Sequence, residues 1–350
     1  MQEIAIRLVL AAAPRLRHGL RDRQGSLQTG WLNEDMAHLE PLEDRLVVLI
    51  GGAGFLGTLV AQELLKRGAR VRIADRHPEK AFRLKPLANL GQIQFTRCSV
   101  THAASMEAAI SGAYAVVYLV GTFGAGQAAL QADGAGLAAR VAAEQGVENF
   151  AYVSAIGADP TSQSGYASTK GQGEEQVRAA FPRASILRPS VLFGEDDNFI
   201  NLFAGVIRTF PIVPVFAPEA KLQPLWVEDA ANAVVNAVAE PERHGGKVFE
   251  IAGPEVLTMM ELHRQIARAQ ARERLLVPVP DGLAGIFAAL PGTPLGSDQL
   301  SLLRKGSVAS GELPGCKQLG IVPRPLELFL DRWMTRYRKY GRFTETAETA

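Results

Sequence analysis

The chain has 350 residues, of which 47% are hydrophobic and 21% are charged, and its formal net charge is +1. This length allows a large buried core, and the near-zero charge gives no basis for nucleic acid as a partner. Cys98 and Cys316 lie far apart and the histidines lack the spacing of metal ligands, so the sequence predicts neither a disulfide framework nor a metal site.

Residues 1–35 differ in composition from the rest of the chain, because they are rich in arginine, lack lysine and contain few acidic residues. Such a leader is typical of a mitochondrial transit peptide. We favour the alternative, an extension that is disordered or never translated, because Met36 lies a short distance before the first predicted strand. No apolar run in the chain approaches the length needed to span a bilayer.

The first predicted elements form the start of a nucleotide-binding strand–helix–strand unit. Residues 46–50 are a continuous apolar run, as expected for a buried parallel strand, and an amphipathic helix covers 61–67. Between them, Gly51, Gly54 and Gly57 allow a tight turn and let the backbone approach a pyrophosphate at the helix N-terminus. This pattern predicts dinucleotide binding.

The end of the second predicted strand, over 71–74, bears on which dinucleotide is bound. Asp75 lies close to the position, roughly 20 residues past the glycine turn, of the carboxylate that binds the ribose 2′-hydroxyl of NAD. Arg76 follows directly and is able to pair with the 2′-phosphate of NADP. The sequence therefore favours NADP(H) and leaves NAD(H) as the alternative.

Strands alternate with helices beyond this point. We predict strands over 92–95, 114–120, 150–153 and 185–187, and a helix over 128–145. The alternation predicts a doubly wound parallel sheet whose ligands bind beyond the C-terminal ends of the strands. The residues that fall at such ends are Gly51, Asp75, Gly121, Ser154 and Pro189.

Tyr166 and Lys170 lie four residues apart at the start of a helix predicted to end at Phe181, so they share one face of it. A tyrosine has an ordinary pKa of about 10. Because a nearby ammonium favours the phenolate, we expect Lys170 to lower the pKa of Tyr166 and suit it to general acid or base catalysis.

Together these motifs resemble the short-chain dehydrogenase/reductase superfamily in its two-domain, extended form. The resemblance is strong over residues 45–255. It implies that Tyr166 is a catalytic acid or base and that Lys170 also binds the nicotinamide ribose. The cofactor-binding residues that it implies are Gly51, Gly54, Phe55, Leu56, Gly57, Asp75, Arg76, Gly121, Lys170 and Pro189.

The third catalytic residue of such enzymes is a hydroxyl that holds the substrate oxygen, and Ser154 is assigned this role here. In extended members this hydroxyl falls about two residues further along, where the chain has Ile156. Ser162 and Ser164 are alternative hydroxyl donors, and the alternative role for Ser154 is that of a strand-end cap.

The predicted fold class is therefore α/β, a doubly wound Rossmann sheet of the extended type with a smaller C-terminal domain for substrate or partner. We expect four parts along the chain. They are an N-terminal extension (1–35), the NAD(P)-binding domain (36–194 and 223–252), the smaller interleaved domain (195–222 and 253–330), and a basic amphipathic segment with its tail (331–350).

Three segments near the C-terminal end carry further expectations. Thr258 and Glu261 predict a capping box that opens a helix. Residues 281–297, rich in glycine, proline and alanine, predict a mobile flap or docking surface. Residues 326–342 interleave apolar and basic side chains, which suits contact with an anionic membrane surface or packing into an assembly. The alternative for 326–342 is a terminal helix packed on its own domain with a solvated basic edge.

Segments 147–160, 180–190 and 210–214 resemble one branch of the superfamily, the nucleotide-binding accessory subunit of respiratory complex I and its bacterial relatives. That resemblance implies a tightly held structural nucleotide and complex I subunits as partners. It also implies a cytoplasmic protein, peripheral on the inner membrane, or one on the matrix side if the leader is a transit peptide. The alternatives are a free NAD(P)-dependent oxidoreductase or epimerase acting on a sugar-nucleotide, quinone or similar carbonyl, and an NADP(H)-dependent redox-sensing regulator.

Overall fold

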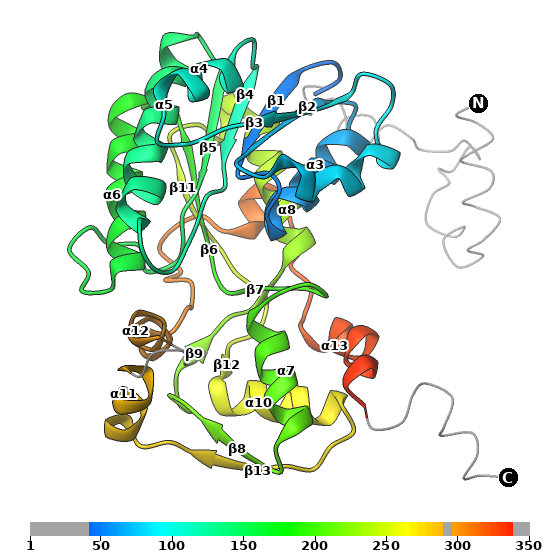
Figure 1. Cartoon of the computed structure of the whole chain (residues 1–350), viewed down its shortest axis with the longest axis vertical. Coiled ribbons are helices and arrows are strands. Elements are labelled where there is room, and N and C mark those ends of the chain that lie inside the picture. Colours follow the sequence, from blue (N-terminus) through cyan, green and yellow to red (C-terminus); the bar gives the residue numbers. More distant parts are fainter. Residues whose placement is uncertain (1–41, 290–295, 339–350) are drawn as a thin grey trace, which may run out of the picture. The chain divides into compact units, whose positions relative to one another are not determined.

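The computed structural model describes residues 42–289 and 296–338, with no account of the side chains of 286–289. Its centre is a parallel sheet of seven strands in the order β11-β6-β5-β4-β1-β2-β3 (Figure 1). This confirms the predicted doubly wound parallel sheet. The strands are β1 (Leu46–Ile50), β2 (Arg70–Asp75), β3 (Ile93–Arg97), β4 (Ala115–Tyr118), β5 (Asn149–Val153), β6 (Ser185–Pro189) and β11 (Val248–Ile251).

The strand order reverses between β1 and β4. The chain runs outward from β1 through β2 to β3, returns to β4 on the other side of β1, and continues outward to β5, β6 and β11. Such a reversal opens a crevice beyond the C-terminal ends of the two central strands, where ligands bind in open α/β sheets. Gly51 follows β1 and Gly121 lies just past β4, so both predicted residues are placed at this crevice.

Helices cover both faces of the sheet (Figure 1). Strand β1 shows why, because Val47 and Leu49 join the core on one face while Val48 and Ile50 join the core on the other, all fully buried. One face is covered by α3 (Phe55–Lys66) and α8 (Val227–Ala239). The other face is covered by α4 (Ala103–Ile110), α5 (Gly134–Glu144) and α6 (Gly165–Ala180).

A third core lies outside the sheet. It is built from α7 (Phe199–Thr209), α10 (Met259–Ala269), α13 (Glu327–Met334) and the parallel two-stranded ribbon of β8 (Ile212–Val215) and β13 (Leu275–Pro278). The predicted capping box opens α10, because Glu261 N–H donates to Thr258 Oγ1 at 3.1 Å and Thr258 N–H donates to Glu261 Oε2 at 2.7 Å. The predicted domain boundaries stay a prediction.

Short elements complete the described chain. The helical ones are η2 (Pro78–Leu87), η3 (Ala128–Asp133), α9 (Pro241–His244), α11 (Asp281–Ala289), α12 (Ser297–Lys305), η4 (Cys316–Leu319) and η5 (Thr335–Tyr337). The strands are β7 (Leu192–Phe193) paired with β10 (Leu225–Trp226), and β9 (Lys221–Leu222) paired with β12 (Leu257–Thr258). The segment predicted as a flap therefore forms helices at both of its ends, and its middle, 290–295, lies outside the described residues, as does 1–35.

The C-terminal segment is packed on its own part of the chain. Five of its apolar side chains, which favoured membrane contact, are buried in the third core, whereas Leu328 is 55% exposed. These buried residues are Leu326, Phe329, Leu330, Trp333 and Met334. Residues 339–342 of the predicted membrane segment lie outside the described part.

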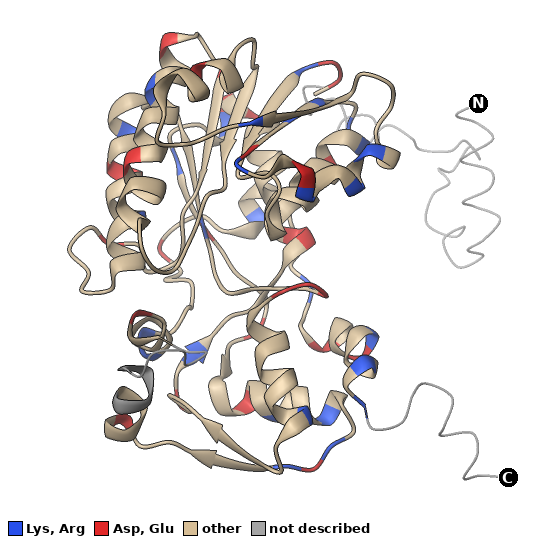
Figure 2. Ribbon diagram, in the orientation of Figure 1, with Lys and Arg blue, Asp and Glu red and all other residues tan. Residues whose placement is uncertain are grey.

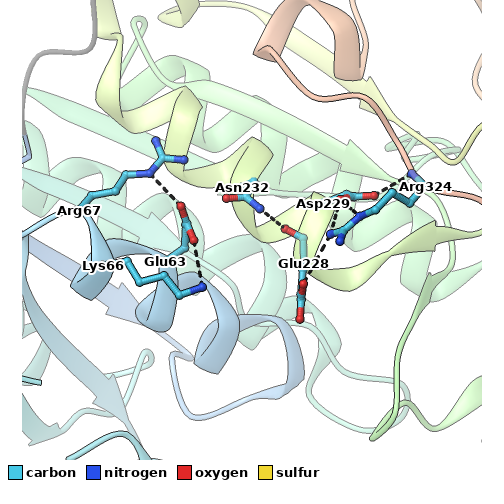
Figure 3. Close-up of polar contacts among 7 residues, drawn as sticks. All are labelled: Glu63, Lys66, Arg67, Glu228, Asp229, Asn232 and Arg324. Carbon is cyan, nitrogen blue, oxygen red and sulfur yellow. Dashed lines mark hydrogen bonds and ion pairs between the residues drawn. The ribbon is translucent and has the colours of Figure 1, made fainter. Parts of the chain in front are cut away.

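Arg324 fastens this segment to the sheet helix α8 (Figure 3). Its guanidinium donates to Asp229 Oδ1 from Nε at 2.9 Å and from the terminal nitrogen at 2.7 Å, and its backbone N–H donates to Oδ2 at 2.9 Å. The Asp229 side chain is only 6% exposed and lies in the first turn of α8. A buried carboxylate is costly unless it is paired, so this contact fixes where the segment before α13 crosses the sheet domain.

Candidate functional site

A cavity of about 210 Å³ lies at the C-terminal ends of β1, β2 and β4. Its walls include five of the predicted cofactor-binding residues, namely Gly51, Gly54, Asp75, Arg76 and Gly121. The other lining residues are Ala74, Cys98, Val100, Leu119, Val120 and Leu130. Phe55, Leu56 and Gly57 lie in the first turn of α3 and Pro189 ends β6, and these four do not line the cavity.

The glycine turn has the shape that a pyrophosphate needs. Gly51 has φ +80°, in the left-handed region that favours glycine. A Cβ on Gly57 would lie 2.7 Å from Gly52 Cα, so only glycine allows α3 to begin this close to the turn. Gly54 is the N-cap of α3 and no side chain caps the helix, so the helix N-terminus is left for an anion. The residues therefore fit a dinucleotide.

A second cavity, of about 440 Å³, shares Arg76 and Cys98 with the first. Its remaining lining residues are His77, Arg97, Ser99 and Ser105. Sequence reasoning missed all four. For Arg97 the reason is that only its pairing with Asp75 across β2 and β3 shows that it reaches this place. Two guanidiniums and two hydroxyls around one cavity are a donor set that suits a phosphate group.

The carboxylate of Asp75 accepts a hydrogen bond within the turn that follows β2. Its Oδ1 accepts a hydrogen bond from the backbone N–H of His77 at 2.9 Å. Arg97 Nε donates to the backbone carbonyl of Arg76 at 3.2 Å, which holds the end of β3 against the end of β2. These contacts place both arginines beside the cavity and leave their remaining N–H groups for a ligand.

Lys170 bridges two strand ends. Its side chain is buried, and Nζ donates to the carbonyls of Val153 at 2.8 Å and Val120 at 3.0 Å. Burial lowers the pKa of Lys170 to about 7, against the opposing effect of Glu174. A Cβ on Gly121 would lie 3.6 Å from Nζ, so the ammonium lies beside the wall of the first cavity.

Tyr166 lies on the same helix but makes a different set of contacts. Its ring stacks on Phe123 with centroids 4.3 Å apart, and Lys170 Nζ lies 6.0 Å from the ring centroid. Burial raises the pKa of Tyr166 to about 12. The expectation that Lys170 lowers this pKa is wrong for this arrangement, because desolvation outweighs an ammonium that is already bound to two carbonyls.

Ser154 is held by a buried acid. Its hydroxyl donates to Glu174 Oε1 at 2.6 Å, and Arg188 donates to both oxygens of the same carboxylate at 2.8 Å. Arg178 adds a further bond to Glu174 Oε2 at 2.9 Å. The Ser154 hydroxyl therefore has a partner within the fold, and its catalytic role stays a prediction.

The two alternative serines also have partners. Ser164 is the N-cap of α6 and accepts from Ala167 N–H at 3.3 Å, while Ser162 Oγ accepts from Lys305 Nζ at 3.0 Å. Each candidate hydroxyl of the sequence analysis thus contributes to holding α6 or α12 in place.

The Tyr166 end of α6 is covered from two sides. Asp298, in the first turn of α12, accepts from the backbone N–H of Tyr166 at 3.1 Å and from Gln127 Nε2 at 3.4 Å. Phe123, which stacks on Tyr166, lies in the loop before Gln127. Sequence reasoning missed both Asp298 and Phe123, because neither belongs to a recognisable motif.

The helix predicted over 128–145 is present, and its first part is a π-helix, η3, which continues into α5. The hydroxyls of Tyr118 and Tyr152 donate to the carbonyls of Leu130 and Gln131. Gln131 is fully buried, and its Nε2 donates to Thr169 Oγ1 at 3.1 Å. Such π-turns are frequent beside functional sites, and this one forms the roof of the cavity at Leu130.

Two searches of the described residues gave negative results. Nowhere in 42–289 or 296–338 do three His, Cys, Asp or Glu side chains gather as metal ligands would. The helices in these ranges include none with the length and apolar character needed to cross a bilayer.

Comparison with known proteins gives matches over most of the chain. Residues 51–202 match a family model described as NAD(P)H-binding. The mouse protein named NADH dehydrogenase [ubiquinone] 1 alpha subcomplex subunit 9, mitochondrial, is 30% identical over 84% of this chain and 81% of its own length. The Dictyostelium discoideum protein of the same name is 32% identical over 67% of each chain. A ceramide reductase of Caulobacter vibrioides is 27% identical over 71% of this chain and 80% of its own length.

Solved structures share the fold. An NADPH-dependent quinone oxidoreductase of Escherichia coli, complexed with NADPH, has a TM-score of 0.66 with 22% identity over 81% of this chain and 98% of that one. A UDP-glucose 4-epimerase of Thermotoga maritima has a TM-score of 0.64 with 18% identity over 83% and 98%. With its NAD(P)H-binding segment and its likeness to the mouse protein over most of both chains, this chain belongs to the family of subunit 9 of the NADH dehydrogenase [ubiquinone] 1 alpha subcomplex.

Proposed function

We propose that the chain is an accessory or assembly subunit of respiratory complex I that binds NADP(H) as a structural nucleotide. The observation that carries this proposal is a contrast between two parts of the site. The turn and helix N-terminus that would bind the nucleotide are intact, while the predicted catalytic side chains contact other residues of the fold. The cradle keeps the Gly51 turn and the uncapped N-terminus of α3. The names of the mouse and Dictyostelium relatives, which describe subunits of an NADH dehydrogenase, support the choice of partner.

Each predicted catalytic group lacks the freedom that turnover needs. The Ser154 hydroxyl donates a hydrogen bond to Glu174, and Tyr166 stacks on Phe123 with its pKa raised to about 12. A general acid or base works best with a pKa near the operating pH, and burial moves that of Tyr166 the other way. Lys170 retains its second role, because its position beside Gly121 suits an ammonium that binds a ribose hydroxyl.

The second cavity supports NADP(H) rather than NAD(H). Arg76 and Arg97 are able to form charge-assisted hydrogen bonds with a 2′-phosphate, which NAD lacks. Asp75 would repel that phosphate, but its Oδ1 already accepts from His77 N–H, which offsets part of its charge. Two cations beside one partly satisfied carboxylate favour the phosphorylated nucleotide.

In this proposal the chain is peripheral to the membrane that holds complex I. The mitochondrial relatives favour the matrix side for a chain with a transit peptide, and the cytoplasmic face of the inner membrane is the equivalent place in a bacterium. The nucleotide then stabilises the chain in the assembly and takes no part in electron transfer.

A native gel tests the proposal. The chain is tagged in its host, membranes are solubilised gently, and migration is compared with that of quinone-linked NADH dehydrogenase activity, followed by extraction and identification of bound nucleotide. We expect co-migration and bound NADP(H). Gly57→Val, whose side chain would clash with Gly52, should lose nucleotide, stability and assembly, whereas Tyr166→Phe should keep all three. A chain that migrates alone in both membrane and soluble fractions contradicts the proposal.

A second candidate function is a free NAD(P)-dependent oxidoreductase. The specific observation in its favour is that Tyr166 and Lys170 are both present near the start of α6, with Lys170 Nζ close to Gly121, which lines the first cavity. The ceramide reductase relative and the quinone oxidoreductase fold are consistent with carbonyl reduction. For this function Tyr166→Phe should abolish turnover while leaving cofactor affinity nearly unchanged. In an accessory subunit the same change should have no effect.

A further inference from the structure

The ribbon of β8 and β13 exposes apolar side chains on the side away from its core. Val213 and Val215 of β8 are fully buried, as expected for alternation along a strand. On the other side Ile212, Leu275 and Val277 are 58%, 62% and 40% exposed. Leu275 pairs with Ile212 in the register, so these side chains are adjacent. A half-buried ribbon usually carries polar residues toward solvent, and a continuous apolar side marks a binding surface.

Phe210 extends this apolar side. It lies two residues before Ile212 in extended backbone, with φ −109° and ψ 137°, and is 54% exposed. Only Pro211 separates Phe210 from Ile212, so Phe210 lies beside the start of the apolar row. We call Phe210, Ile212, Leu275 and Val277 the ribbon face.

Arginines gather at the end of the ribbon where Phe210 lies. Because β8 and β13 are parallel, the residues that precede both strands meet there, and these include Arg208, Arg272 and Arg274. The guanidinium of Arg208 lies 5.6 Å from the ring centroid of Tyr337 and that of Arg336 lies 5.2 Å from it. Arg272 donates to the Tyr337 carbonyl at 3.0 Å. Tyr337 therefore contacts Arg208, Arg272 and Arg336.

This cluster has a net positive charge. Within the residues that the structure describes, none of Arg208, Arg272, Arg274 and Arg336 forms an ion pair with a carboxylate, although Glu273 lies among them in the chain. The pKa of Arg272 is lowered by burial and by repulsion from Arg274 and Arg208. In Figure 2 the two strands of the ribbon carry no charged residue, and blue segments lie at the end described here.

We propose that the ribbon face and this arginine cluster together dock the chain on the surface of a membrane that contains anionic lipids. The apolar side chains of the ribbon face enter the boundary between headgroups and acyl chains, while the guanidiniums bind lipid phosphates. Charge complementarity selects this occupant, because a row of apolar side chains next to unpaired cations matches the order of layers in an anionic leaflet. The proposal concerns the chain by itself and does not rest on its association with complex I.

This surface differs from the one expected from the sequence. Apart from Leu328, which is 55% exposed, the apolar residues of 326–334 are buried in the third core, so the described part of that segment supplies Arg336 and no continuous apolar row. The apolar half of the surface comes instead from two strands that lie 60 residues apart in the sequence and meet only in the fold.

Vesicle flotation of the full-length protein tests the proposal. The vesicles are phosphatidylcholine alone, or phosphatidylcholine mixed with an equal amount of phosphatidylglycerol. We expect flotation with the mixed vesicles, weakened by salt, and little with phosphatidylcholine alone. The double change Ile212→Ser and Leu275→Ser should weaken binding by about tenfold or more. Arg208→Gln, which removes no hydrogen bond of the described structure, should weaken it by about fivefold.

Matched controls lie in the nucleotide-binding part of the chain. Leu90→Ser changes an apolar residue that is fully exposed, and Arg140→Gln removes an exposed arginine of α5, so both should bind like the wild type. Thermal unfolding confirms that each variant folds. A folded wild type that does not float overturns the proposal, as do ribbon variants that bind like the controls. If the ribbon variants lose co-migration with complex I while the wild type ignores vesicles, the face is a protein interface and the lipid proposal is wrong.

Discussion

At the scale of single residues, Arg97, which sequence reasoning missed, bears most directly on the choice between NADP(H) and NAD(H). Arg97 lies across the second cavity from Arg76 and is held there by a bond to the Arg76 carbonyl. A motif could identify Arg76, because it follows Asp75 directly. Arg97 could not be found in this way, since its place depends on the pairing of β2 with β3 and no local pattern encodes that register.

We predict that Arg97→Gln weakens NADP(H) binding by roughly tenfold to a hundredfold, because a hydrogen bond between charged groups contributes about 1.5–3 kcal/mol. Binding of NAD(H) should change little, since it has no 2′-phosphate. Titration of each nucleotide by calorimetry measures the difference, and Arg140→Gln serves as the control for loss of one positive charge. Equal losses for both nucleotides would place Arg97 away from the 2′-phosphate.

Lys170 gives a prediction for pH. Its folded pKa of about 7 lies below the ordinary 10.5, so between these values the unfolded chain retains a proton that the folded chain has released. The contribution of Lys170 to stability therefore rises with pH from about 7 to about 10.5, by at most about 1.4 kcal/mol per pH unit. Lys170→Met removes this dependence. Denaturant unfolding of both proteins without nucleotide should show free energies whose pH slopes differ in this window, and parallel slopes would refute the assignment.

At the scale of elements, regular patterns were predictable and contacts between distant segments were not. Six of the seven strands of the sheet, all but β11, follow from hydrophobic runs, and the capping box of α10 follows from a local motif. The π-helix could not be foreseen, because it depends on hydroxyls of Tyr118 and Tyr152 on two other elements. The role of Ser154 likewise depends on Glu174 from α6, which the sequence alone does not bring near it.

The ion pair that holds α6 against β6 offers a test at this scale. Glu174 is nearly inaccessible, and its carboxylate accepts from Ser154, Arg188 and Arg178. We predict that Glu174→Gln lowers the free energy of unfolding by about 3 kcal/mol, because it removes the buried carboxylate that accepts two hydrogen bonds from the half-buried Arg188 guanidinium. Glu175→Gln, the same change at the next and exposed residue, should cost under about 0.5 kcal/mol in the same urea titration.

At the scale of the whole described chain, the nucleotide-binding sheet and the third core are linked through a few long-range contacts. Arg324 is one of them, since it connects the segment before α13 to the first turn of α8. The sequence showed a basic, aromatic C-terminal segment but could not show that its apolar side chains complete a core begun by residues from α7 and α10. Most apolar side chains of this segment are buried against a surface made by earlier residues, while contact of its basic edge with a membrane stays a prediction.

We predict that Arg324→Met lowers the free energy of unfolding by about 2 kcal/mol, because it leaves the Asp229 carboxylate unpaired and nearly inaccessible. The value is set below that of a fully buried pair, since the Arg324 side chain is 38% exposed. Arg304→Met is a matched control, because Arg304 is 40% exposed but its partner Asp281 is 79% exposed, and such surface pairs contribute at most about 1 kcal/mol. Hydrogen exchange should localise the loss of Arg324 to α13 and the start of α8. Equal costs for the two arginines would mean that the burial of the carboxylate does not set the strength of this link.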